Sequence, residues 1–152
     1  MGYKTSIIIN HSIDKVFKAF IDLNKIELPK FNKSNPKETT YKKVVKQVRQ
    51  RKIEMLTEIT EYEKDELYEV TNTIEGDKYI TRYEFKKVSE EETEILILEK
   101  QEASNIITKG SLLLQKLFAK KRLKEKSEGL REYLTREIDR RYKNQNNNIE
   151  EN

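Results

Sequence analysis

A chain of 152 residues is long enough to form one domain around a single hydrophobic core. It contains no cysteine, which excludes disulfides and thiolate zinc sites, and its net charge of +4 does not by itself indicate nucleic-acid binding. No run approaches the roughly 20 apolar residues of a membrane span and no secretion signal is readable, so we expect a cytoplasmic protein.

The first elements are a strand and a helix. Alternating apolar residues predict a strand over residues 4–10. Ser12 is a suitable N-cap for the helix that follows, and apolar residues at helical spacing continue it to about Asp22. Pro29 and Pro36 then limit any second helix to a turn or two.

The period changes to two between about Glu38 and Ala103. Successive segments carry apolar or aromatic residues on one face and charged residues on the other, and "EGD" at residues 75–77 is a hairpin turn. In the last segment the phase is ambiguous, with Thr93, Ile95, Ile97 and Glu99 as the favoured inner row. The pattern predicts antiparallel strands with one wet face.

A single long helix is predicted over residues 106–142, spanning on the order of 50 Å. Its apolar stripe would cover the apolar face of the sheet, and core packing alone accounts for that stripe. The stripe consists of Leu112, Ala119, Leu123, Leu130, Leu134 and Ile138. Residues 143–152, with "NQNNNIEEN", have no periodicity and are expected to form a disordered polar tail.

Three stretches resemble a known superfamily: "IIINHSIDKVFKAFID", "YITRYEFKKVSEEETEILILEKQ" and "LFAKKRLKEKSEGLREYL". The chain resembles a START-like (SRPBCC, pollen-allergen-like) domain over residues 4–142, and the last stretch is similar to a small bacterial group of unknown function. The resemblance implies an α+β helix-grip fold in one domain, residues 1–142. In that fold, a curved antiparallel sheet of six or seven strands packs on a long C-terminal helix, with two short helices after the first strand.

The resemblance also implies a cavity between the sheet and the C-terminal helix. Members of the superfamily bind lipids, sterols or polyketides, or activate chaperones, and a minority catalyse cyclisation or aromatisation. We therefore expect non-enzymatic binding of an apolar small molecule or lipid, with no cofactor. A chaperone co-factor-like interaction module is the alternative, and a cyclase or aromatase-type enzyme comes third. The expected ligand-binding residues are Thr57, Tyr68, Val70, Asn72, Thr81, Tyr83, Phe85, Ile97, Glu99, Leu113 and Leu117.

Residues that would support catalysis are scarce. His11 is the only histidine and is expected to be a solvated residue in the turn before the first helix, so no metal site of the usual histidine-rich kind is possible. Glu99, if it points inward, could have a raised pKa and exchange a proton with a ligand. Alternatively it reaches water or pairs with a lysine near the end of the sheet.

The start of the long helix carries a possible surface patch. Leu114 and Phe118 lie nearly opposite the apolar stripe, beside Lys121 and Arg122, and residues 109–126 hold seven basic residues and one acid. An exposed pair of this kind would suit a membrane surface or a protein partner, unless the loop of residues 24–38 covers it or the helix bends there. Nucleic acid is an unlikely partner, because the bases surround the helix and no aromatic ladder accompanies them.

Overall fold

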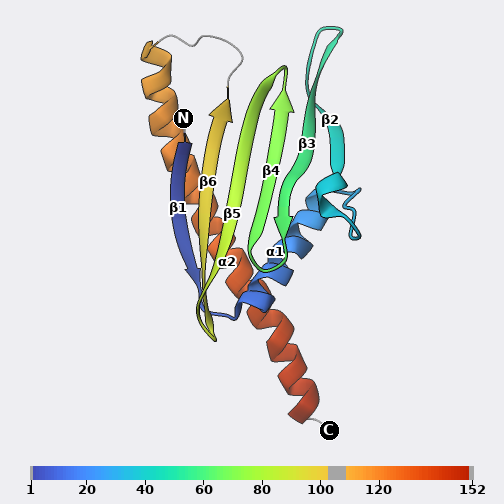
Figure 1. The fold of residues 1–152 in the computed structure, drawn as a ribbon, viewed down its shortest axis with the longest axis vertical. Coiled ribbons are helices and arrows are strands. Elements are labelled where there is room, and N and C mark those ends of the chain that lie inside the picture. The colour runs from blue at the N-terminus through green and yellow to red at the C-terminus, as the bar shows by residue number, and fades with distance from the viewer. Residues whose placement is uncertain (1, 103–108, 151–152) are drawn as a thin grey trace.

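The computed structural model describes residues 2–102 and 109–150, with the side chains of the last helix described from Ala119 to Lys143. The elements in chain order are β1 (Gly2–Ile9), α1 (Ile13–Glu27), the short 3-10 helix η1 (Pro36–Glu38), β2 (Thr40–Val48), β3 (Arg51–Glu63), β4 (Leu67–Ile74), β5 (Asp77–Ser89), β6 (Glu92–Glu102) and α2 (Lys109–Glu150). The six strands form one antiparallel sheet in the order β1-β6-β5-β4-β3-β2. Both long helices lie on the same face of this sheet (Figure 1).

The phase of the strands is as predicted. Thr93, Ile95 and Ile97 of β6 are no more than 1% exposed, so they form the inner row, and Ile97 pairs with Tyr83 of β5. The side chain of Thr93 also donates a 2.8 Å hydrogen bond to the carbonyl oxygen of His11, which fixes the turn between β1 and α1. Alternation places this face against the helices because adjacent side chains on a strand point to opposite sides.

The segment between β1 and β2 differs from the prediction of two short helices. It holds one α-helix, which runs past Asp22 to Glu27 and stops before Pro29, since a residue preceding proline avoids helical conformation. No second α-helix follows in this segment, only the single turn of η1. The side-chain oxygen of Asn32 accepts hydrogen bonds from the backbone amides of the next residues, which satisfies locally the donors that a helix would pair.

An aromatic cluster joins α1 to the sheet. Phe20 of α1, 1% exposed, packs its ring 4.7 Å from that of Tyr83, 5.2 Å from that of Tyr68 and 5.1 Å from that of Phe85, measured between ring centroids. Phe17 lies one helical turn earlier and contacts Phe85 edge-on at 5.0 Å. These contacts place this part of the core between α1 and the central strands β4 and β5.

The second helix covers the rest of that face. Leu123, Leu134 and Ile138 of the predicted stripe are buried, as expected for the side of α2 that faces the sheet and α1. The backbone of α2 is helical as far as Glu150, which corrects the predicted helix end at Tyr142 and the predicted irregular tail after it. Leu112 of the stripe lies outside the residues whose side chains are described.

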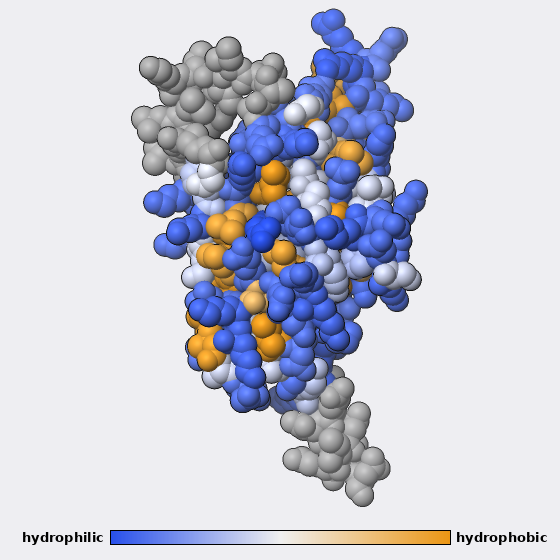
Figure 2. Space-filling view, in the orientation of Figure 1, coloured by the Kyte–Doolittle hydropathy of each residue, from blue (hydrophilic) through white to orange (hydrophobic). Residues whose placement is uncertain are grey.

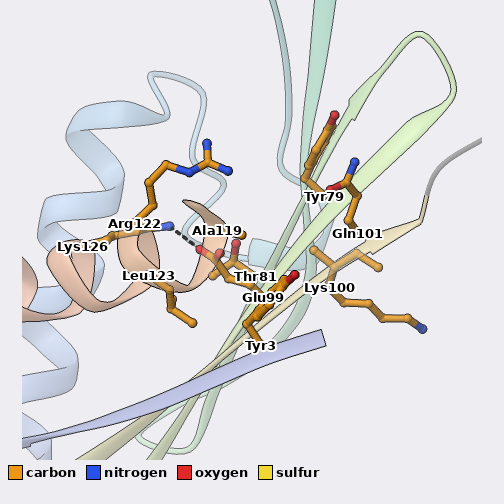
Figure 3. Close-up of a pocket in the computed structure, with 11 residues that line it drawn as sticks. Tyr3, Tyr79, Thr81, Glu99, Lys100, Gln101, Ala119, Arg122, Leu123 and Lys126 are labelled. Carbon is orange, nitrogen blue, oxygen red and sulfur yellow. Dashed lines mark hydrogen bonds and ion pairs between the residues drawn. The ribbon is translucent and has the colours of Figure 1, made fainter. Parts of the chain in front are cut away.

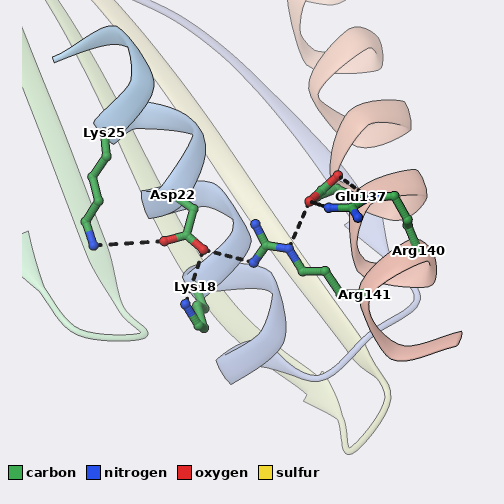
Figure 4. A network of polar contacts seen from close by, with 6 residues as sticks. All are labelled: Lys18, Asp22, Lys25, Glu137, Arg140 and Arg141. Atoms are coloured by element: carbon green, nitrogen blue, oxygen red, sulfur yellow. Dashed lines mark hydrogen bonds and ion pairs between the residues drawn. The ribbon is translucent and has the colours of Figure 1, made fainter. Parts of the chain in front are cut away.

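A polar network fastens α2 to α1 (Figure 4). The guanidinium of Arg141 donates to Asp22 of α1 at 2.9 Å and to Glu137 of its own helix at 3.0 Å. Arg140 donates to the same Oε1 of Glu137 at 2.6 Å and to its Oε2 at 3.2 Å. Hydrogen bonds from these two arginines lower the pKa of Glu137 to about 2, so the carboxylate keeps its charge throughout the physiological range.

His11 takes part in the same junction, which corrects the prediction of a solvated loop residue. Its Nε2 lies 2.8 Å from the carboxylate of Asp139 on α2, and the imidazole is 18% exposed. The histidine therefore links the turn after β1 to the last helix. Within the part of the chain that the structure describes, no helix has the length and apolar character needed to cross a membrane.

Candidate functional site

A cavity of about 490 Å³ lies between the inner face of the sheet, the end of α1 and the middle of α2. The sheet supplies its walls from β2 to β5, α1 and the residue after it close one side, and α2 contributes one lysine. The lining residues are Asn24, Glu27, Leu28, Tyr41, Lys43, Met55, Thr57, Tyr68, Val70, Asn72, Thr81, Tyr83 and Lys126. The cavity thus mixes apolar and aromatic walls with polar and charged groups.

Six of the expected ligand-binding residues lie along this cavity, namely Thr57, Tyr68, Val70, Asn72, Thr81 and Tyr83. Phe85 and Ile97 are buried in the core and do not line the cavity. Glu99 lies in a neighbouring pocket. The side chains of Leu113 and Leu117 are outside the described residues.

Several lining residues were not expected. Tyr41 and Lys43 come from the edge strand β2, where the sequence pattern gave no clear inner row, although their register with Thr57 and Met55 puts them on the inner face. Asn24 and Glu27 belong to the part of α1 beyond its predicted end. Lys126 is one of many basic residues of α2, and the sequence does not distinguish it from the others. Only its position 3.3 Å from the carboxylate of Glu99 on the sheet does so.

The hydroxyl of Tyr68 is the most unusual polar group in the cavity wall. Tyr68 is 0% exposed, and its hydroxyl oxygen is the one buried side-chain polar atom without a hydrogen-bond partner among the described residues. Burial raises the pKa of this phenol, and Tyr83 and Glu27, which both line the cavity, raise it further. The phenol therefore stays neutral, and Tyr68 lies beside other cavity-lining residues. Its hydroxyl can donate a hydrogen bond but has no acceptor among the described residues.

Lys126 joins the cavity to the neighbouring pocket of about 300 Å³. Its ammonium group lies 3.3 Å from the carboxylate of Glu99, and the two side chains reach toward each other across the gap between β6 and α2 (Figure 3). Desolvation lowers the pKa of Lys126, but Tyr83 and Glu99 outweigh it and keep the pKa above its usual value. Of the two alternatives for Glu99, pairing with a lysine is therefore the one found.

The possible surface patch is described only in part. Leu114 and Phe118 fall outside the residues whose side chains are described, while Lys121 and Arg122 are exposed. Arg122 also lines the neighbouring pocket.

The described residues contain no group of three or more histidine, aspartate or glutamate side chains that could hold a metal ion. In the cavity itself the ionisable groups are two lysines, one glutamate and three tyrosines. Among the described residues, no histidine or aspartate lines the cavity.

Residues 3–120 match a family described as a domain of unknown function, DUF3284. No curated protein matches the chain significantly.

Solved structures with the same fold include SA2116, a protein of unknown function from Staphylococcus aureus, which is 15% identical over 94% of this chain and 97% of its own, with a TM-score of 0.64. Ara h 8.0201 is 13% identical over 91% and 97%, with a TM-score of 0.59. TTHA0849 from Thermus thermophilus is 18% identical over 88% and 97%, with a TM-score of 0.57. The match confirms the predicted SRPBCC-type helix-grip fold, and at these identities it concerns the fold alone.

Proposed function

The chain belongs to the DUF3284 family, and we propose from its cavity that it binds a small, mainly apolar molecule or lipid between the sheet and α2 without transforming it. The volume of about 490 Å³ is within the range of pockets that enclose a small organic ligand. The observation that carries the proposal is the cavity together with Tyr68, which lines it and whose buried hydroxyl has no hydrogen-bond partner among the described residues. Leaving a buried donor unpaired costs about 1–3 kcal/mol, and a ligand oxygen would recover that cost.

The lining divides the cavity into two chemical environments. Met55, Val70 and the rings of the tyrosines form an apolar surface on the sheet, which suits a hydrocarbon or ring system. Lys43 and Lys126 supply positive charge, whereas Glu27 is the only acidic residue among the described residues that line the cavity. A ligand with an apolar body and one polar or anionic group fits this distribution better than a purely apolar one.

Binding without catalysis is the simplest use of these groups. Lys126 keeps its proton and is paired with Glu99, so it acts as a fixed positive charge and not as a nucleophilic amine. The histidine of the chain is bonded to Asp139 on the side of the molecule where the two helices meet, and it does not line the cavity.

A variant that fills the cavity tests the proposal. Val70→Phe places an aromatic ring in the cavity, on a strand where phenylalanine is well tolerated. We expect at least a tenfold loss of affinity for cis-parinaric acid, a fluorescent fatty acid, and the loss of any compound that native mass spectrometry detects with the wild-type protein. Val88→Phe is the matched control, because Val88 is 51% exposed on β5 and does not line the cavity. Equal binding by both variants, or no binding of the fatty acid by the wild-type protein, contradicts the proposal.

A further inference from the structure

The hairpin formed by β2 and β3 carries an unusual concentration of positive charge. Residues 42–52 contain six basic residues and no acidic residue. This charge exceeds the net charge of the whole chain, +4, so the remainder of the protein is net negative. One arginine of the hairpin, Arg51, is paired with Glu75 in the adjacent turn, and Lys43 lines the cavity. The other four basic residues, Lys42, Lys46, Arg49 and Lys52, lie along both arms of the hairpin and in its turn.

The same hairpin exposes apolar side chains. Val44, Val45 and Val48 are 48%, 42% and 45% exposed, and they lie within five consecutive residues of β2. A register shift between Val44 and Lys46 inserts an extra residue into the strand, which interrupts the alternation of inner and outer side chains. Lysines on an edge strand protect it from aggregation, but that protection gives no reason for valines to be exposed beside them.

The hairpin lies at the end of the sheet opposite its two most acidic turns. The β2–β3 turn and the β4–β5 turn lie at the same end of the sheet, and the other two hairpin turns are at the opposite end (Figure 1). Those opposite turns are acidic, with three acids in residues 63–66 and three in residues 89–92. Figure 2 shows the hydrophilic tip of the β2–β3 hairpin with hydrophobic surface close below it. A molecule of this polarity meets an anionic surface with the hairpin first.

We propose that the β2–β3 hairpin is a docking site for anionic lipid bilayers. In this arrangement the basic side chains contact lipid headgroups, while the three valines enter the boundary between headgroups and acyl chains. Bilayers are favoured over nucleic acid because a phosphate backbone offers nothing to valine, and residues 42–52 contain no aromatic side chain that could stack on a base. Docking does not require an occupied cavity, so it can be tested separately from ligand binding.

Vesicle sedimentation tests the proposal with the full chain. We expect binding to vesicles of phosphatidylcholine mixed with phosphatidylglycerol, no binding to phosphatidylcholine alone, and weaker binding as the salt concentration rises. Lys46→Gln and Arg49→Gln should each weaken binding about fivefold. Val44→Ser combined with Val48→Ser leaves the charge unchanged and should weaken binding roughly tenfold.

Matched controls come from the opposite end of the sheet. Lys86→Gln combined with Val88→Ser removes one exposed base and one exposed valine from β5 and should leave vesicle binding unchanged. Val70→Phe should also bind vesicles like the wild-type protein, even when its cavity is blocked. The proposal is overturned if the valine variant binds anionic vesicles like the wild-type protein, if neutral vesicles bind equally well, or if duplex DNA binds more tightly than the vesicles do.

Discussion

The hydroxyl of Tyr68 provides the sharpest test of the cavity, because its removal should change stability and ligand binding in opposite directions. In the protein without ligand, this hydroxyl is buried and has no partner, which costs about 1–3 kcal/mol. Tyr68→Phe removes the polar atom and leaves a void of only one oxygen, so the free energy of unfolding should rise by about 1 kcal/mol. For a chain of this length, that corresponds to an increase in Tm of about 2–4 °C.

Ligand binding should respond with the opposite sign. If the hydroxyl donates to a ligand oxygen, Tyr68→Phe loses one hydrogen bond, worth about 1 kcal/mol, and affinity for the fatty acid should fall about fivefold. Tyr83→Phe is the matched control for stability. The Tyr83 hydroxyl already interacts with Lys126, so its removal should lower the free energy of unfolding.

Urea denaturation of the delipidated proteins measures the stability change, and an unchanged m-value would show that both variants unfold from the same compact state. Fluorescence titration with the fatty acid measures affinity. Destabilisation by Tyr68→Phe would refute the reasoning, because it would mean that the hydroxyl has a partner in the protein. Unchanged affinity would show that the hydroxyl does not face the ligand.

Three further predictions concern the core and the junction of the helices. Phe20→Ala should lower the free energy of unfolding by about 3–5 kcal/mol in urea denaturation, because the ring is 1% exposed and packs against three aromatic residues of the sheet. His11→Ala should cost about 1 kcal/mol through loss of the bond to Asp139, and Asp139→Ala should add little to it in the double variant. Lowering the pH should destabilise the protein between pH 4.5, the ordinary pKa of Glu137, and its folded pKa of about 2. A carboxylate whose pKa is lowered by folding stabilises the protein above this window, and the stabilisation is lost as the pH falls through it. A Tm that stays flat in thermal melts across the window would contradict this prediction.

The sequence predicted the strand phase and the buried side of the long helix because both depend on local periodicity. Alternation favoured Ile95 and Ile97 for the inner face, although the phase of that strand was ambiguous, and a helical period placed Leu123 and Leu134 on the buried side of α2. The N-cap at Ser12 is also a local property of the backbone, whereas α1 ends at Glu27 and not at the predicted Asp22. The end of α2 was missed because a polar segment without periodicity carries no signal that separates helix from irregular chain.

The composition of the cavity was decided only by the tertiary structure. The alternation of a strand predicts which side chains point into the core, but it does not predict which residues they contact there. Tyr83 and Phe85 are both inward residues of β5, yet only Tyr83 lines the cavity, and Phe85 packs against Phe17 and Phe20 of α1. Lys126 likewise became part of the site only because α2 crosses the sheet beside Glu99. Such partners lie far apart in the chain, and only the packing of the helices on the sheet brings them within contact distance.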